Sequence, residues 1–490
     1  MNKILIANRG EIAVRIIRAC KEMNIKTVAV YSTADKDSLH TKLADEAICI
    51  GEGPAQKSYL NIQNILEAAN ITGSDSIHPG YGFLSENAKF AKICEESHIK
   101  FIGPKSDVID SLGNKSNSKE LMKKCGIPVI PGSDGSVKSI EEAKKVSKKI
   151  GYPIMLKAAN GGGGKGIRVV YNENDLEKSY ILVKQEAKKS FNDDEIYIEK
   201  FIENPRHIEI QIMADEYGNV VHLGERDCTI QRNHQKIIEE TPSQVLDDKL
   251  RNKMGETAIK VAKAAGYTSL GTVEFLVDKD KNYYFMEMNT RVQVEHPITE
   301  IRTNIDLIKE QIRIAANEKL KIKQKDIEFR NYVIECRVNA ENPYKNFMPC
   351  PGKITGLNLP GGNGIRIDTG IYEGYTIPSY YDSMIAKLIV YGTSRNEAIA
   401  KLKRALEEFV IEGLTTNIDF IFEIIKNPDF IRGNYDTSFI DKNFKKWNIW
   451  GRSCFVSFLK HSGTDLKRFI FDTKQDRPQM FQIRKEEPKW

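Results

Sequence analysis

The sequence predicts a multidomain protein that combines the α/β and α+β fold classes. At 490 residues, the chain has the length of about two to four domains with a substantial core. Strand and helix patterns alternate over about the first 112 residues, whereas several later strands follow one another across short polar turns. The first pattern is typical of a parallel sheet covered by helices, and the second is typical of antiparallel hairpins.

The N-terminal region is expected to form a Rossmann-like unit. Residues 3–7 predict a short buried strand, residues 10–22 carry apolar side chains at helical spacing, and residues 27–31 predict the next strand. The turn at residues 8–11 holds a single glycine, so the dinucleotide fingerprint is absent and we expect no nicotinamide cofactor. Glycines within residues 77–86 follow a predicted strand, where they permit either a close approach to a ligand or a structural turn.

A glycine-rich segment lies between two predicted strands within residues 153–170. Its glycines match the spacing of a dinucleotide loop, but a strand follows them instead of a helix. The P-loop pattern fails too, because Ala159 stands where it requires glycine and Gly166 where it requires serine or threonine. What remains is a flap whose main-chain N–H groups could fold over phosphates, with Lys157 supplying positive charge. A flexible surface hairpin is the alternative interpretation.

The middle of the chain predicts further strands, a loop and helices. Residues 195–202 predict a strand, and residues 207–213 alternate with polar side chains on one face. We expect the polar stretch 225–239 to form a loop that carries functional groups. Residues 247–265 and 304–317 have the periodicity of amphipathic helices.

A hairpin with paired acids is the strongest chemical signal in the sequence. Residues 271–277 and 286–297 predict two extended segments joined by the polar turn 278–282, which places Glu274 nearly opposite Glu287. Two such carboxylates repel each other, so either a divalent cation lies between them or one is protonated. Oxygen ligands without Cys or His favour Mg²⁺ or Mn²⁺, and Mg²⁺ of this kind works with substrate phosphates. The same face of the second segment carries Asn289, Arg291, Gln293 and Glu295.

The C-terminal region predicts a mixed α/β domain. Residues 332–339 predict a strand with Glu335 and Arg337 on one side, and residues 395–411 predict a helix. From about Trp447 the periodicity is poor, and this tail contains all three tryptophans of the chain. We interpret the tail as an extension, a docking arm for a partner, or a segment without an evolved role.

Composition excludes several classes of function. A net charge of +6, from 73 basic and 67 acidic residues, is too small to indicate nucleic-acid binding. The sequence shows neither a leader pattern nor an apolar run long enough to cross a membrane, so we expect a cytoplasmic protein. The eight cysteines contain no C-x-x-C pair, so we expect reduced thiols instead of disulfides or a zinc site.

Several ordered motifs resemble the biotin carboxylase family, the ATP-grasp subunits of bacterial acetyl-CoA carboxylase. The resemblance covers residues 1 to about 446. The motifs lie at residues 8–13, 78–87, 161–166, 225–228, 231, 234–236, 286–297 and 380–384.

The resemblance implies a division of the chain into parts. It predicts a Rossmann-like domain at residues 1–112 and an ATP-grasp domain at 113–330, with a mobile glycine-rich lid at about 130–203. A mixed α/β C-terminal domain would occupy residues 331–446. The tail at 447–490 matches nothing in the family.

The resemblance also implies a reaction. ATP would phosphorylate bicarbonate to carboxyphosphate, with two Mg²⁺ or Mn²⁺ ions bridging the phosphates, and CO₂ would pass to biotin on a biotin carboxyl carrier protein. This is the first half-reaction of acetyl-CoA carboxylase in fatty acid synthesis, with malonyl-CoA as the final product. The implied partners are the carrier protein and the carboxyltransferase subunits, and the implied assembly is a homodimer.

The resemblance assigns roles residue by residue. The residues that would surround ATP are Lys115, Lys157, Gly162, Gly163, Gly164, Glu199, Lys200, Ile202, His207, Gln231, His234 and Leu276. Those that would hold the metal ions are Glu274, Glu287 and Asn289. Those that would contact bicarbonate or biotin are Lys236, Arg291, Gln293, the Val294 main-chain N–H, Glu295, Arg337, Tyr81 and Asp382. Of these, Glu295 would be the general base and Arg337 would stabilise the biotin enolate.

Two departures and two alternatives accompany this interpretation. Asn233 stands where many relatives carry a second basic residue, and the tail from Trp447 departs from the family. The chain also has no biotinylation signature, so it resembles a separate subunit. One alternative is another ATP-grasp ligase that forms an acyl phosphate. The other is a catalytically inactive scaffold that senses nucleotides, although every expected lysine, metal-binding acid and base is present.

Overall fold

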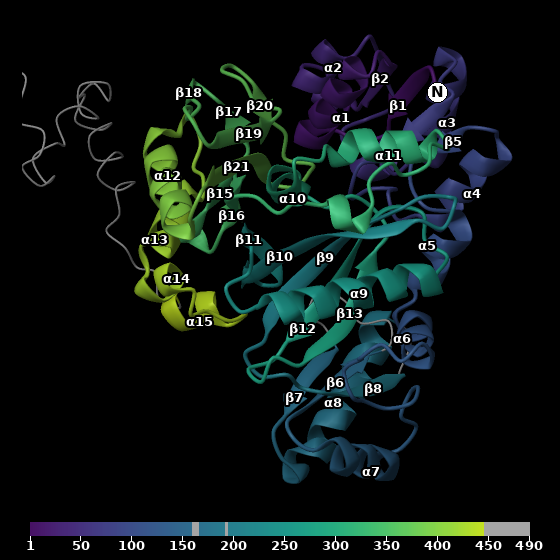
Figure 1. Ribbon diagram of the computed structural model, residues 1–490, viewed down its shortest axis with the longest axis vertical. Helices are drawn as coiled ribbons and strands as arrows, with labels where there is room; N and C mark the ends of the chain where they lie inside the picture. The colour runs from purple at the N-terminus through teal and green to yellow at the C-terminus, as the bar shows by residue number, and fades with distance from the viewer. Residues whose placement is uncertain (159–165, 192–194, 445–490) are drawn as a thin grey trace, which may run out of the picture.

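The computed structural model describes residues 1–158, 166–191 and 195–444 of the chain. The predicted flap glycines 162–164 and the tail 447–490 lie outside the described residues, as does the side chain of Lys115. Figure 1 shows the N-terminal unit at the upper right, a long central sheet, a small α/β unit at the bottom and the C-terminal elements at the left.

The N-terminal unit is a five-stranded parallel sheet in the order β3-β2-β1-β4-β5. This order confirms the Rossmann-like prediction. Successive strands are added on one side of β1 up to β3 and on its other side from β4 onward, and ligands of such sheets bind at this switch point between β1 and β4. At this point Asn8, which follows β1, donates hydrogen bonds to the carbonyls of Pro79 and Tyr81, which follow β4. The elements are β1 (Lys3–Ile6), α1 (Gly10–Glu22), β2 (Lys26–Tyr31), α2 (Leu39–Leu43), β3 (Glu46–Cys49), α3 (Ile62–Thr72), β4 (Ser76–His78), α4 (Ala88–Glu96), β5 (Lys100–Phe101) and α5 (Ser106–Gly113).

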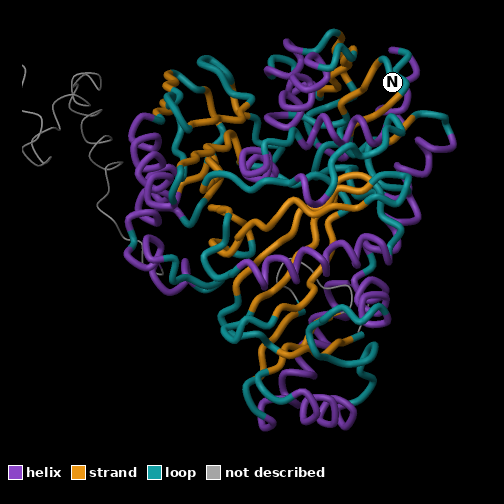
Figure 2. The backbone as a smooth tube through the Cα atoms, in the orientation of Figure 1, coloured by secondary structure: helices purple, strands orange, loops and turns teal. Residues whose placement is uncertain are grey.

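The central sheet has eight antiparallel strands in the order β13-β12-β9-β10-β11-β14-β21-β19. Figure 2 shows these strands running through the middle of the molecule, with helices on both sides. The strands are β9 (Arg206–Ala214), β10 (Val220–Arg232), β11 (Gln235–Thr241), β12 (Ser269–Val277), β13 (Tyr283–Asn289), β14 (Tyr332–Asn339), β19 (Ile365–Thr369) and β21 (Met384–Gly392). Because β11 pairs with β14, the sheet continues across the predicted boundary at residue 330.

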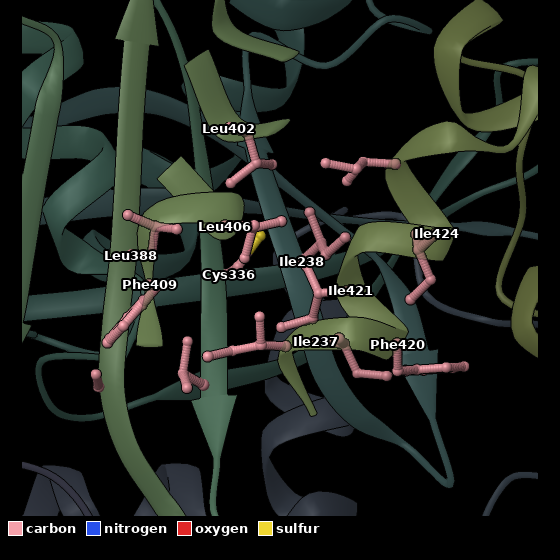
Figure 3. Close-up of a cluster of buried hydrophobic side chains, with 14 of the residues drawn as sticks. Ile237, Ile238, Cys336, Leu388, Leu402, Leu406, Phe409, Phe420, Ile421 and Ile424 are labelled. Atoms are coloured by element: carbon pink, nitrogen blue, oxygen red, sulfur yellow. The ribbon is translucent and has the colours of Figure 1, made fainter. Parts of the chain in front are cut away.

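Helices cover the central sheet. The helices are α6 (Lys115–Lys124), α9 (Asp248–Ala264), α10 (His296–Thr303), α11 (Leu307–Ala315), α12 (Arg395–Glu408), α13 (Ile418–Lys426), α14 (Pro428–Arg432) and α15 (Phe439–Phe444). Figure 3 shows where α12 and α13 bury Leu402 and Phe420 against Ile238, Cys336 and Leu388 of the sheet. Short pairs complete this region: β15 (Glu341–Asn342) with β16 (Met348–Pro349), β17 (Gly352–Lys353) with β20 (Thr376–Ile377), and β18 (Gly356–Asn358) with β22 (Val410–Glu412).

The small unit holds the strands that flank the predicted flap. Its antiparallel sheet has the order β7-β6-β8, and its own core includes Ile154, Leu156 and Ile198. The elements are α7 (Ile140–Ile150), β6 (Ile154–Ala158), β7 (Ile167–Val170), α8 (Leu176–Phe191) and β8 (Ile196–Lys200). The prediction of strand, flap and strand is therefore confirmed for the two strands.

Two predictions of local structure are wrong. Residues 225–239 form no long loop, because β10 and β11 continue through them as a hairpin with a turn at 233–234. Glu225 and Arg226 are buried in ion pairs, so their charge did not indicate exposure. The extended segment predicted over residues 286–297 ends at Asn289, and its last residues belong to α10, which begins at His296 with Pro297 in its first turn.

Two further expectations concern thiols and membranes. Within the described part of the chain, seven cysteines are free thiols, and Cys20, Cys94, Cys228 and Cys336 are buried. Among the described helices, none is both long and apolar enough to cross a membrane.

Candidate active site

The predicted metal hairpin forms with the expected register. Glu274 of β12 lies directly opposite Glu287 of β13, and Thr272 lies opposite Asn289. Glu274 is 5% exposed, and its Oε1 accepts hydrogen bonds from Asn289 Nδ2 (2.9 Å) and Gln293 Nε2 (2.8 Å). His207 Nε2 lies 3.0 Å from Glu274 Oε2. Burial works against ionisation of Glu274, but Lys236 and His207 outweigh it and hold its pKa well below the usual range.

Lys236 joins three carboxylates at the centre of the site. Its Nζ lies 2.6 Å from Glu209 Oε2, 3.2 Å from Glu274 Oε1 and 2.6 Å from Glu295 Oε1. The three acids come from β9, β12 and the segment before α10, while Lys236 comes from β11. A buried ammonium of this kind needs such partners, because an unpaired charge in the interior is costly. The arrangement places the positive charge of Lys236 beside Glu274, a predicted metal ligand, and beside Glu295, the predicted general base.

Glu295 is held between two cations. Lys236 approaches its Oε1, and Arg337 Nη2 donates to its Oε2 at 2.9 Å. Burial opposes the ionised form, but Lys236, Arg337 and Arg226 hold the pKa of Glu295 well below its usual range. The two cations therefore favour the ionised form of the carboxylate. Arg337 is fixed in turn by Glu239, whose Oε1 accepts from Arg337 Nε at 2.6 Å.

Arg226 supports the site from inside the sheet. Its fully buried guanidinium donates to Glu209, to Gln211 Oε1 (2.6 Å) and to Gln293 Oε1 (2.6 Å). It also donates to the hydroxyls of Thr272 and Thr299, each at 2.9 Å. Because Gln293 donates onward to Glu274, Arg226 fixes the amide that faces the metal hairpin.

Arg291 contacts an acid of the N-terminal unit. Its Nε donates to Glu86 Oε2 at 2.8 Å, and its Nη2 donates to Asn289 Oδ1 at 3.0 Å. The same glutamate accepts from the Thr290 main-chain N–H at 3.2 Å. Glu86 thus ties the segment after β13 to the N-terminal unit.

Two lysines meet one acid near the predicted flap. Lys157 Nζ lies 2.5 Å from Glu199 Oε2, and Lys119 Nζ lies 2.7 Å from Glu199 Oε1. Lys200 instead donates to the Gly151 and Tyr152 carbonyls, at 3.2 and 2.8 Å. The structure therefore brings Lys157 and Glu199 together but directs Lys200 toward the residues just before β6.

The remaining predicted nucleotide residues are spread over the neighbouring strands. Gln231 Nε2 contacts His207 Nδ1 at 2.8 Å, and Leu276 lies opposite His207 in the register of β12 and β9. Ile202 is partly exposed after β8, and His234 is exposed in the turn between β10 and β11. The structure places Gln231, Leu276 and His207 together and leaves His234 at the rim.

Tyr81 and Asp382 are both linked to Glu11 of the N-terminal unit, Tyr81 by a hydrogen bond and Asp382 by a shared cavity. The Tyr81 hydroxyl donates to Glu11 Oε1, and Glu11 and Asp382 both line a cavity of about 30 Å³. Asp382 is exposed and accepts a hydrogen bond from the Met384 main-chain N–H at 2.8 Å.

The donor set fits a hard divalent cation. Two opposed carboxylates with a neighbouring amide oxygen are oxygen ligands, which Mg²⁺ and Mn²⁺ prefer. His207 lies within reach of Glu209 and Glu274, so a nitrogen ligand is also available on the same face. Such an ion would offset the repulsion between Glu274 and Glu287.

Sequence reasoning gave no role to several residues that the structure places in or beside the site. These are Glu11, Glu86, Lys119, Glu209, Arg226, Glu239 and Lys387. Glu209 had a usable signal, because a charged residue inside a predicted strand requires a buried partner, whereas Arg226 lay in a stretch predicted to be a loop. Glu11 and Lys387 meet only through the fold, so no local pattern could pair them.

Family models match three segments of the chain. The biotin carboxylase N-terminal domain matches residues 1–109, and the biotin carboxylase C-terminal domain matches residues 335–442. Between them, the ATP-binding domain of the carbamoyl-phosphate synthase L chain matches residues 114–323.

Relatives of known name cover nearly the same part of the chain. Biotin carboxylase 1 of Bacillus subtilis (strain 168) is 56% identical over 442 residues, which cover 90% of this chain and 98% of the relative. A pyruvate carboxylase subunit from Methanothermobacter thermautotrophicus is 54% identical over 441 residues, which cover 90% of each chain.

Solved structures agree with these matches. The biotin carboxylase βγ-ATP complex from Campylobacter jejuni has a TM-score of 0.86 at 52% identity, covering 90% of this chain and 99% of that chain. The biotin carboxylase domain dimer of Hydrogenobacter thermophilus 2-oxoglutarate carboxylase, with MgADP, ADP and bicarbonate, has a TM-score of 0.86 at 49% identity. It covers 92% of this chain and 99% of that chain. The chain therefore belongs to the biotin carboxylase family, and it is an ATP-dependent ligase of the ATP-grasp type.

Proposed function

We propose that this ligase uses ATP and bicarbonate to carboxylate biotin on a carrier protein, as the first half-reaction of an acetyl-CoA carboxylase. The observation that carries the proposal is the position of Glu295, an ionised carboxylate fixed between Lys236 and Arg337. A general base must lie within hydrogen-bond reach of its proton and be unprotonated at the working pH. Glu295 meets the second requirement through its two cationic neighbours.

The proposed division of roles follows the contacts. Glu295 removes the proton of bicarbonate, while Lys236, Arg291, Gln293 and the Val294 main-chain N–H hold the anion. Arg226 and Glu209 keep Gln293 and Lys236 in place. This arrangement fixes the reacting groups before the substrate arrives, which lowers the entropic part of the barrier.

Arg337 has a different task from Glu295 in this proposal. It supplies a fixed charge where negative charge develops on the biotin ring, and Glu239 sets its direction. Tyr81 and Asp382 flank the same pocket. Glu295 therefore acts in the activation of bicarbonate, and Arg337 acts in the carboxylation of biotin.

We assign the metal and nucleotide sites to neighbouring residues. Glu274, Glu287 and Asn289 hold Mg²⁺ or Mn²⁺, which would neutralise the charge of the ATP phosphates. Lys157, Glu199, His207, Gln231 and Leu276 line the nucleotide side. The Lys157–Glu199 contact must reorganise for Lys157 to reach a phosphate.

The acceptor and the partners belong to the proposal as well. Relatives include biotin carboxylases, a 2-oxoglutarate carboxylase domain and one component of a pyruvate carboxylase. We infer a separate subunit that works with a biotin carboxyl carrier protein and carboxyltransferase subunits, and that forms a homodimer. The division into parts at residues 112, 330 and 446 is proposed with it.

The test is a coupled assay with purified components. We expect ATP cleavage to require bicarbonate and to increase with free biotin, and the carboxylated carrier to yield malonyl-CoA with acetyl-CoA carboxyltransferase. Bicarbonate-independent ATP cleavage would contradict the carboxylase assignment. Carboxyl transfer to pyruvate or 2-oxoglutarate, but not to acetyl-CoA, would contradict only the proposed acceptor.

A further inference from the structure

Lys387 of β21 is a fully buried lysine beside the proposed active site. Its side chain has no exposed surface, and its Nζ has two acceptors from distant parts of the chain. The Val294 carbonyl lies at 2.9 Å, and Glu11 Oε1 of α1 lies at 3.1 Å. Burying an ammonium is costly unless its partners are well placed, so these two contacts define its position.

The first contact bears on Glu295. The Val294 carbonyl belongs to the peptide that joins Val294 to Glu295, so its orientation sets the direction in which the Glu295 side chain leaves the backbone. The segment from Thr290 to Val294 belongs to no strand or helix, and therefore lacks a ladder of main-chain hydrogen bonds. Lys387 supplies an anchor that this segment does not obtain from secondary structure.

The register of the sheet places Lys387 next to Arg337. The two residues lie directly opposite each other on β21 and β14, so their side chains share one face. Arg337 binds the carboxylate of Glu295 at 2.9 Å, and Lys387 binds the peptide that precedes it. Arg337 thus holds the carboxylate of Glu295, and the neighbouring Lys387 holds the peptide bond that precedes Glu295.

The second contact extends the anchor to the N-terminal unit. Glu11 Oε1 accepts both the ammonium of Lys387 and the hydroxyl of Tyr81. Tyr81 follows β4, at the point where the order of the parallel sheet reverses. A continuous chain of buried contacts therefore runs from Tyr81 through Glu11 and Lys387 to Val294.

We propose that Lys387 is a positioning residue that orients Glu295 for proton abstraction, and that Glu11 holds Lys387 in place for this task. The inference rests on the proposed function, since it gives Glu295 the role of base. In this proposal Lys387 acts on Glu295 through the Val294 carbonyl. A displacement of about 1 Å in a reacting group can cost on the order of 10² in rate, so the anchor has a measurable consequence.

The kinetic test uses Lys387→Met, which keeps the length of the side chain but removes its charge and its donor. We expect kcat/KM for bicarbonate to fall on the order of 10- to 100-fold, while the KM for ATP stays within about twofold. The matched control is Lys401→Met, because Lys401 likewise donates to a main-chain carbonyl, that of Tyr391 in β21, at 2.9 Å. We expect the control to keep the wild-type kcat/KM.

A second variant keeps the test decisive if Lys387→Met does not fold. Lys387→Met leaves Glu11 buried without its cation, which costs stability. The double variant Lys387→Met with Glu11→Gln removes that charge and is expected to show the same loss for bicarbonate. Wild-type kinetics in the double variant would overturn the proposal.

A measurement without substrate separates this inference from the proposed function. We expect hydrogen exchange at the His296 and Ile298 amides, which close the turn after Val294, to be about tenfold faster in Lys387→Met. Exchange in the strands of the central sheet should change little. If the wild type cleaves ATP without bicarbonate, the proposed function fails, yet this exchange still tests the anchor. Unchanged exchange at these amides would overturn the positioning role.

Discussion

Replacing Glu239 by glutamine should remove a contribution to stability that weakens as the pH rises. Glu239 has no exposed surface, lies opposite the equally buried Glu335, and accepts a hydrogen bond from Arg337 at its Oε1. Burial raises its pKa from 4.5 to about 7, against the lowering effect of Arg337 and with a further rise from Glu295. Lys236 is the other charged group that lowers it.

The sign follows from linkage. A carboxyl whose pKa is higher in the folded state stabilises the fold below its unfolded pKa and loses that contribution as the pH rises through the folded value. At about 1.4 kcal/mol per pKa unit, the change from 4.5 to about 7 corresponds to roughly 3 kcal/mol. We therefore expect the unfolding free energy of the wild type, relative to Glu239→Gln, to fall by about 2 to 3 kcal/mol between pH 5 and 8.

Urea denaturation at several values of pH between 5 and 8 measures this difference, because urea carries no charge. The control is Glu397→Gln, which removes an exposed carboxylate whose pKa is lowered to about 2, mainly by Lys401 and Thr393. The difference in unfolding free energy between the wild type and Glu397→Gln should not change over the same pH range, since the carboxylate stays ionised throughout. A flat or rising difference for Glu239→Gln would refute the raised pKa and the account of the buried pair.

Four further substitutions test the site. Glu287→Gln should raise the Mg²⁺ concentration for half-maximal ATP cleavage about tenfold or more, and a wild-type titration would contradict the metal assignment. Glu295→Gln should lower bicarbonate-dependent ATP cleavage by about 10² or more and preserve ATP binding measured by calorimetry; parallel loss of both would exclude a base. Arg337→Ala should retain part of the bicarbonate-dependent ATP cleavage and lower biotin carboxylation by on the order of 10² to 10³. Equal losses in both activities would contradict separate roles for Glu295 and Arg337. Arg226→Met should cost about 3 to 5 kcal/mol in urea denaturation because Glu209 loses one of its two buried cationic partners and the hydrogen bonds of the guanidinium are lost, and a loss below about 1 kcal/mol would argue against that pairing.

Local patterns predicted the parts of the fold that depend on neighbours in sequence. The hairpin register of Glu274 and Glu287 followed from counting back from a turn, and the structure confirms it. The helix at residues 10–22 and the strand at 332–339 were predicted with the bounds that the structure has. In each case the period of apolar side chains decides the element.

The failures occurred where distant partners change what a local pattern means. The stretch 225–239 was assigned to a loop because it is polar, yet Arg226 is buried by Glu209 and by Gln293, which is 67 positions away. Polar composition reports exposure only when no partner is available in the interior. The start of α10 was missed for a related reason, since alternating side chains continue past the end of β13.

The sequence predicted which residues belong to the candidate site better than it predicted the contacts that hold them in place. Glu295, Lys236 and Arg337 were named together, and the structure brings them into contact. Their roles, the domain boundaries and the flap remain predictions. The supporting residues Glu239 and Lys387 reach the site through strand pairing, which a single sequence does not specify.

The shared ladder between β11 and β14 constrains how this protein can be divided or recombined. A cut at residue 330 would separate β11 from β14, which bond to each other over Ile238 to Thr241 in the middle of the intact sheet, and would leave each fragment with an unpaired edge strand. Such edges invite pairing with other chains, so we expect isolated halves to aggregate unless they are produced together. Gene fusions and exchanges of modules should therefore preserve the whole of this sheet, and a split reporter made at this point should reassemble by strand complementation.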